Sequence, residues 1–242
     1  MKGIRHRSGL VQVAGICHLH EARMLLDAGV DLLGFPLALD FHEEDLPGHE
    51  VARIVRLLGL EQRGVLITYL TRPEKIAALV RQIGVQNVQL HGRVTRGSLH
   101  ELRKLVPGLA VIKSLIVRES NLGELETEIR VLEDLVDGFI TDTFDPETGA
   151  CGATGRTHDW HVSRRLVHTA KKPLILAGGL SPRNVVQAIL TVRPFGVDAH
   201  TGLEDCDGRK DPSKVREFVN AAKLGFACTL GPGSPAGACR IN

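Results

Sequence analysis

Short apolar runs alternate along the chain with longer segments in which apolar residues recur every three or four positions. The short runs have the length of buried β-strands, and the longer segments have the period of amphipathic helices. The alternation occurs eight times, with strands expected at 11–15, 31–36, 64–68, 87–91, 110–114, 138–142, 173–177 and 196–200. The helices expected between them include 21–28, 49–58, 73–83, 122–136, 182–190 and 212–222.

Proline marks the start of three of these helices. Pro73 follows Thr71 and Arg72, Pro182 follows Ser181, and Pro212 follows Asp211. Proline at the first helical position gives up no hydrogen bond, and Ser or Asp before it can cap the helix. Each proline therefore predicts where its helix begins.

The strands read as nearly continuous apolar runs, such as Val-Leu-Ile at 65–67, which is typical of parallel strands buried on both faces. Eight strand–helix units in 242 residues predict a single parallel (β/α)8 TIM barrel, since such barrels have roughly 250 residues. A doubly wound open sheet is the alternative, but it fits eight regular units less well. We expect the barrel to occupy residues 1–225 and a flexible tail, rich in Gly, Pro and Ala, to occupy 226–242.

Composition and charge argue against several kinds of partner and site. The net charge of +2 arises from 30 basic and 28 acidic residues without a basic stripe, so nucleic acid is not expected as a partner. No apolar stretch approaches the ~18 residues of a membrane span, and residues 1–10 do not resemble a signal peptide, so we expect no membrane association and a cytoplasmic protein. The five cysteines form no CxxC pair, and the 11 histidines match no zinc spacing, so reduced thiols and no metal site are expected.

The active site of a (β/α)8 barrel lies at the C-terminal ends of its strands. After the seventh and eighth strands stand Gly178 and Gly179, then His200, Thr201 and Gly202. Small residues there let backbone N–H groups approach an anion at a helix N-terminus, which predicts a phosphate cradle. The alternative is that these glycines only form turns.

Asp142 directly follows the apolar part of the sixth strand, and His91 ends the fourth. A carboxyl group in a partly dry pocket can have its pKa raised into the range of a general acid. A loop aspartate that merely caps the next segment is an equally weighted alternative. These positions make Asp142 a candidate acid and His91 a second candidate catalytic residue.

An ordered set of motifs resembles the phosphoribosylanthranilate isomerase family over about residues 11–222. The motifs are Gln-Leu-His-Gly at 89–92, Asp142 with Thr143, Gly-Ala-Thr-Gly-Arg-Thr-His-Asp-Trp at 152–160, Leu-Ala-Gly-Gly-Leu at 176–180 and Gly-Val-Asp at 196–198. The resemblance implies a barrel enzyme of tryptophan biosynthesis that rearranges an aminoaldose phosphate to an aminoketose phosphate without metal or organic cofactor. Its acid maps onto Asp142, and its phosphate-binding glycines map onto Gly155, Gly178, Gly179 and Gly202. The expected ligand is a small-molecule phosphosugar, and the expected assembly is a monomer or a homodimer.

The first strand departs from the family. The family has Lys-Ile-Cys-Gly there, whereas this chain has Gln-Val-Ala-Gly at 12–15, so that Ala14 stands at the cysteine that serves as base. A methyl group cannot take a proton, and loss of a positioned base costs roughly 10²- to 10⁴-fold in rate. Cys17 is a candidate displaced base if its thiol faces the pocket.

The loop after the second strand departs as well. The family has an arginine there that meets the anthranilate carboxylate, whereas this chain reads Asp-Phe-His-Glu-Glu-Asp at 40–45. Such acids would favour a neutral or cationic group, unless they are only a solvated loop face. Two smaller departures are His200, which puts an imidazole beside the phosphate, and Ala153, which replaces a glycine.

Three functions follow from these motifs and departures. The first is the family reaction, with Asp142 as acid and Cys17, His18 or another group as base. The second is an isomerase or lyase for another phosphosugar, with His42, His91 or His200 as base. The third is a non-catalytic phosphosugar-binding protein, which would not need an acid at a strand end.

Overall fold

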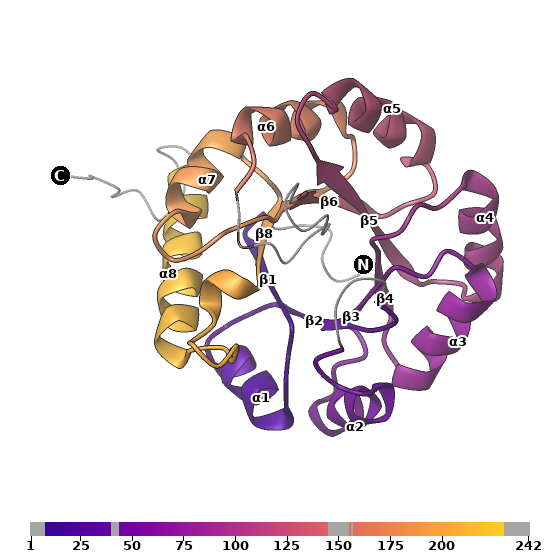
Figure 1. Cartoon of the computed structure of the whole chain (residues 1–242), viewed down its shortest axis with the longest axis horizontal. Helices are drawn as coiled ribbons and strands as arrows, with labels where there is room; N and C mark the ends of the chain where they lie inside the picture. Colours follow the sequence, from indigo (N-terminus) through magenta and orange to yellow (C-terminus); the bar gives the residue numbers. More distant parts are fainter. Residues whose placement is uncertain (1–7, 40–43, 145–154, 156, 230–242) are drawn as a thin grey trace.

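The computed structural model describes residues 8–39, 44–144, 155 and 157–229. Eight parallel strands form one closed barrel in sequence order (Figure 1). They are β1 (Leu10–Ala14), β2 (Leu32–Pro36), β3 (Gly64–Thr68), β4 (Asn87–Leu90), β5 (Ala110–Val117), β6 (Gly138–Thr143), β7 (Leu174–Leu176) and β8 (Gly196–Ala199). Because β1 pairs with β8, the expected (β/α)8 barrel is confirmed and the open sheet is excluded.

The helices form a ring around the barrel (Figure 1). They are α1 (Leu19–Asp27), α2 (Gly48–Leu58), α3 (Pro73–Ile83), α4 (Arg96–Leu105), α5 (Leu122–Leu132), α6 (Trp160–Thr169), α7 (Val185–Val192) and α8 (Pro212–Thr229), with the short 3₁₀ helix η1 (Thr201–Leu203) after β8. Two of the proline-marked starts are confirmed, at Pro73 and Pro212. Asp211 caps α8, since its Oδ1 atom accepts bonds from the N–H groups of Ser213 and Lys214.

The third proline-marked start is wrong. Helix α7 begins at Val185 instead of Pro182. Asn184 explains the shift, because its Oδ1 atom accepts a bond from the N–H of Ser181 and its side-chain nitrogen donates to the carbonyl oxygen of Gly179. These bonds hold residues 181–184 in a turn before the helix starts.

The expected boundary of the tail is also wrong. Helix α8 continues past residue 225 to Thr229, and Phe226 is buried. Gly225 permits this, because a Cβ atom there would lie 3.0 Å from Ile189 Cδ1, so α8 packs closely on α7. Residues 230–242 lie outside the described residues.

The apolar core has two parts. One lies between strands and helices, and the other fills the barrel interior with side chains that include Ile112, Ile140 and Ile175. A buried polar chain crosses that interior: Gln12 Nε2 donates to Gln89 Oε1 (3.1 Å), and Gln89 Nε2 donates to Ser114 Oγ (3.3 Å). These bonds tie β1, β4 and β5 together below the strand ends.

Candidate functional site

A cavity of about 420 Å³ opens at the C-terminal ends of the strands. Its lining includes residues of β1, β3, β4, β6 and β8 and of the loops that follow β2, β7 and β8. Almost every site residue expected from the sequence lines this one cavity: His91, Asp142, Gly155, Gly178, Gly179, His200, Thr201 and Gly202.

Asp142 reaches the cavity because side chains alternate along β6. Ile140, two residues earlier, belongs to the apolar cluster inside the barrel, so Asp142 faces the same way at the end of the strand. Burial raises the pKa of Asp142 to about 7, although its Oδ1 atom accepts a bond from the N–H of Thr143 (2.8 Å) that acts in the opposite direction. A carboxyl group with this pKa is partly protonated at neutral pH and can donate a proton.

His91 flanks this acid. Its Nε2 atom lies 3.9 Å from Asp142 Oδ2, which is beyond hydrogen-bonding distance, and its ring packs against Tyr69 with 4.7 Å between ring centroids. The backbone N–H of His91 donates to the carbonyl oxygen of Thr68, which holds the residue next to β3. His91 therefore shields the Asp142 carboxyl from water.

Asp198, on β8, is a site residue that sequence reasoning missed. It lines the cavity, and its pKa is raised well above the usual value by burial and, secondarily, by the charge of Asp142. Two buried carboxyls in one cavity resist being ionised together. The motif Gly-Val-Asp was noticed, but its inward register on the eighth strand was the signal that could have placed Asp198 in the site.

The expected phosphate cradle lies between β6, β7 and β8. Gly178 and Gly179 have φ values of +105° and +60°, and a Cβ atom at Gly178 would lie 2.2 Å from Thr143 Oγ1. At Gly202 a Cβ atom would lie 2.0 Å from the carbonyl oxygen of Leu180, and at Gly155 it would lie 3.4 Å from Thr201 Oγ1. At Gly178 and Gly202 only glycine allows the chain segments to approach this closely, whereas at Gly155 it is the φ of +66° that favours glycine.

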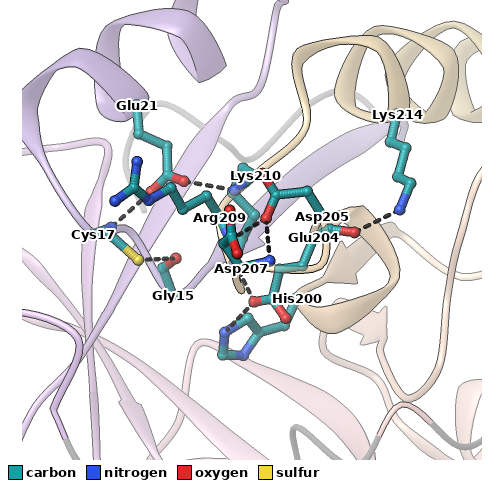
Figure 2. A network of polar contacts seen from close by, with 10 residues as sticks. All are labelled: Gly15, Cys17, Glu21, His200, Glu204, Asp205, Asp207, Arg209, Lys210 and Lys214. Carbon is teal, nitrogen blue, oxygen red and sulfur yellow. Dashed lines mark hydrogen bonds and ion pairs between the residues drawn. The ribbon is translucent and has the colours of Figure 1, made fainter.

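His200 is held at the rim of the cavity by a chain of charged groups (Figure 2). Its Nε2 atom lies 3.2 Å from Glu204 Oε1, which also accepts a bond from Lys210 Nζ (2.7 Å). Burial alone would raise the pKa of Glu204, but the bonds from His200 and Lys210 lower it to about 2. Glu204 is therefore a carboxylate at neutral pH and fixes the orientation of the imidazole.

The structure does not support Cys17 as the displaced base. Cys17 is not among the described residues that line the cavity, and its N–H donates to Glu21 Oε2 (2.6 Å). Burial and the negative charges of Glu21 and Asp45 raise the pKa of the thiol. The condition for its role, a thiol facing the pocket, is not met, because the turn after Gly15 directs this residue toward α1.

Ala14 presents only a methyl group to the cavity. Of the acidic loop at 40–45, Asp45 lines the cavity, whereas Glu44 Oε1 accepts a bond from the N–H of Ala38 (2.7 Å). Among the described residues that line the cavity there is no lysine or arginine. Asp40, His42 and Glu43, like Ala153 in the loop after β6, lie outside the described residues.

In the part of the chain that the structure describes, no group of three or more His, Cys, Asp or Glu side chains could hold a metal ion. Among the same residues, none of the helices combines the length and the apolar character needed to cross a membrane.

Comparison with known proteins identifies relatives of this chain. The family model for N-(5'-phosphoribosyl)anthranilate isomerase matches residues 65–221. N-(5'-phosphoribosyl)anthranilate isomerase 2 of Methanosarcina mazei is 39% identical over 89% of this chain and 95% of its own length.

Solved structures agree with this match. The isomerase of Pyrococcus furiosus superimposes with a TM-score of 0.72 at 26% identity, covering 90% of this chain and 99% of that one. An isomerase in complex with reduced 1-(o-carboxyphenylamino)-1-deoxyribulose 5-phosphate has a TM-score of 0.68 at 26% identity. The match covers 88% of this chain and 98% of that chain. The chain belongs to the phosphoribosylanthranilate isomerase family.

Proposed function

We propose that the protein catalyses the Amadori rearrangement of N-(5'-phosphoribosyl)anthranilate, an aminoaldose phosphate, to the corresponding aminoketose phosphate in tryptophan biosynthesis. The observation that carries this proposal is Asp142, a largely buried carboxyl with a pKa raised to about 7 in the cavity of a family member. In the family, the acid of this reaction stands at the same place.

The proposed chemistry begins at the furanose ring. Asp142 protonates the ring oxygen, the C1–O bond breaks with its electron pair going to that oxygen, and the nitrogen lone pair forms a protonated Schiff base at C1. The glycines at 155, 178, 179 and 202 hold the 5'-phosphate through backbone groups beside η1. A base then removes the proton from C2, and the resulting enolamine tautomerises to the ketose.

The test is turnover of phosphoribosylanthranilate, followed by its fluorescence, in wild type and Asp142→Asn. Asp134→Asn is the control, because Asp134 is a carboxylate on the outer surface that pairs with Arg96. We expect turnover by wild type and the control, and a roughly 10²- to 10⁴-fold lower kcat in Asp142→Asn. Absence of turnover in the wild type, or full turnover in Asp142→Asn, would refute the proposal.

A second candidate is the same reaction, or a lyase reaction, on a phosphosugar whose other half is neutral or cationic. Asp45 favours it, because this carboxyl lines the cavity and none of the described lining residues offers a lysine or arginine to a substrate carboxylate. Comparing kcat/KM for phosphoribosylanthranilate and for the phosphoribosylaniline that lacks the carboxylate decides between the two. A higher value for the aniline compound favours the second candidate.

A phosphosugar-binding protein without catalysis is the remaining alternative, and it would bind the phosphate and show no turnover with either compound. A monomer or homodimer in the cytoplasm stays our prediction, which sedimentation and cell fractionation would test.

A further inference from the structure

We propose that His200, oriented by Glu204, is the general base of this enzyme and replaces the family cysteine that Ala14 has displaced. The inference rests on the proposed function, because it names the group that takes the C2 proton in that reaction.

The first support is the position of the ring. A Cβ atom built on Gly15 would lie 2.0 Å from His200 Nε2 and 2.6 Å from His200 Cδ2, so the imidazole covers the residue next to Ala14. β8 pairs with β1 in the register Val13 to Ala199, which brings His200 beside the end of β1. The edge of the ring that carries Nε2 therefore packs against the end of β1, and both Ala14 and His200 line the cavity.

The second support is the pairing that fixes the ring. Glu204 Oε1 lies 3.2 Å from Nε2, and Lys210 Nζ holds the same carboxylate oxygen at 2.7 Å. The backbone N–H of Lys210 donates in turn to Glu21 Oε1 (2.7 Å), so the loop that carries these groups is tied to α1 (Figure 2). A carboxylate on Nε2 places the imidazole proton there and leaves the lone pair on Nδ1.

The third support is the charge around the ring. Asp45, in the segment before α2, lines the same cavity as His200, and the two groups interact electrostatically. Glu204 is the second carboxyl that faces the ring, whereas Lys210 is the opposing cation and is neutralised by its own bond to Glu204. Both carboxyl groups can therefore place negative charge near the ring in the step that gives it a positive charge.

The step balances without any further reagent. Nδ1 takes the proton from C2 of the protonated Schiff base, the electron pair of the C2–H bond forms the C1=C2 bond, and the C1=N pair returns to nitrogen. The product is a neutral enolamine and an imidazolium. Protonation at C1 and loss of the C2 hydroxyl proton then yield the ketose.

The first experiment compares wild type with His200→Ser, which removes the imidazole and keeps a small polar side chain at the rim of the cavity. We expect kcat to fall roughly 10²- to 10⁴-fold. Affinity for reduced 1-(o-carboxyphenylamino)-1-deoxyribulose 5-phosphate, measured by calorimetry, should stay within about threefold of wild type. Bound analogue also shows that the variant is folded.

Two further variants test how the base works. Ala14→Cys in the His200→Ser background returns a base to β1. The double variant should have a kcat at least tenfold higher than that of His200→Ser alone. Glu204→Gln should lower kcat because the carboxylate no longer orients the ring, and Glu204→Asp should recover part of the loss. If Glu204 had only a structural role, Glu204→Gln and Glu204→Asp would have the same kcat while both kept wild-type affinity for the analogue.

The outcomes separate the two proposals. No turnover by the wild type overturns the proposed function, and the assignment of the base falls with it. Wild-type turnover that survives His200→Ser overturns the base assignment alone. A loss of analogue affinity as large as the loss of kcat also overturns it, because His200 would then hold the phosphate instead of the C2 proton.

Discussion

His91 covers Asp142 from the neighbouring side of the cavity, with 3.9 Å between Nε2 and Oδ2, and this packing makes the activity dependent on pH. The reaction needs Asp142 protonated, and its pKa is about 7, so kcat/KM should fall as the pH rises through about 7. In His91→Ala, water reaches the carboxyl and lowers its pKa, so the fall should move to lower pH. A profile of kcat/KM between pH 5 and 9 measures the shift, and an unchanged upper limb would contradict it.

Asp142 should also make the protein less stable at neutral pH. Because its folded pKa lies above the unfolded value of 3.8, the folded state binds the proton more tightly, and stability is lost as the pH rises from about 4 to about 7. Asp142→Asn removes this effect, so we expect a gain in unfolding free energy on the order of 2 to 4 kcal/mol at pH 7 and little change at pH 4. Urea unfolding at both pH values measures it.

Asp137, at the other end of β6, provides the opposite case. Arg103 Nη2 (2.7 Å) and the N–H of Val111 (2.9 Å) donate to its carboxylate and lower its pKa despite its burial. A lowered pKa contributes stability above the unfolded value, and this stability is lost as the pH falls. Asp137→Asn should therefore destabilise the protein at pH 7. If Asp142→Asn and Asp137→Asn changed the unfolding free energy at pH 7 in the same direction, this account would be refuted.

The phosphate cradle predicts a difference between two glycines of similar conformation. Gly155 (φ +66°) borders Thr201 in the cradle, whereas Gly59 (φ +61°) ends α2 with nothing within 4 Å of its added Cβ atom. Alanine at either position should cost about 1 kcal/mol of stability. Only Gly155→Ala should raise KM and weaken inhibition by inorganic phosphate. A similar loss of phosphate affinity in Gly59→Ala would show that the effect is not local.

Cys17 should be dispensable for catalysis. Its thiol lies outside the described cavity lining and has a raised pKa, so little thiolate forms at neutral pH. Cys17→Ser should keep kcat within about twofold of wild type, and iodoacetamide should modify the thiol slowly at pH 7. A large loss of kcat in Cys17→Ser would restore the displaced-cysteine hypothesis.

The fold was predictable because its signals are local and repeated. Apolar runs such as 64–68 give strands, and prolines at 73 and 212 mark helix starts correctly. The errors occur where a side chain or a tertiary contact overrides the local signal. Asn184 holds a turn where Pro182 suggested a helix, and packing against Ile189 keeps α8 helical through Gly225.

Which residues line the cavity was predictable where position along a strand decides it, as for Asp142 and His91. Sequence alone could not reveal that Asp45, from a loop, lines the same cavity as His200 and interacts with it electrostatically, because this depends on how two loops fold over the barrel. Nor could it show that Glu204 and Lys210 orient that ring. The number of residues between two positions does not tell how far apart their side chains lie when they belong to different loops.

The pairing of β1 with β8 also constrains when the barrel can close during synthesis. Leu10 pairs with Gly196, so the first strand has one open edge until nearly the whole barrel has been synthesised. At about 5 to 20 residues per second, that edge stays open on the ribosome for about 10 to 40 s. During this time an apolar strand offers unpaired N–H and C=O groups to other chains, which is a hazard of aggregation that ends only when the barrel closes.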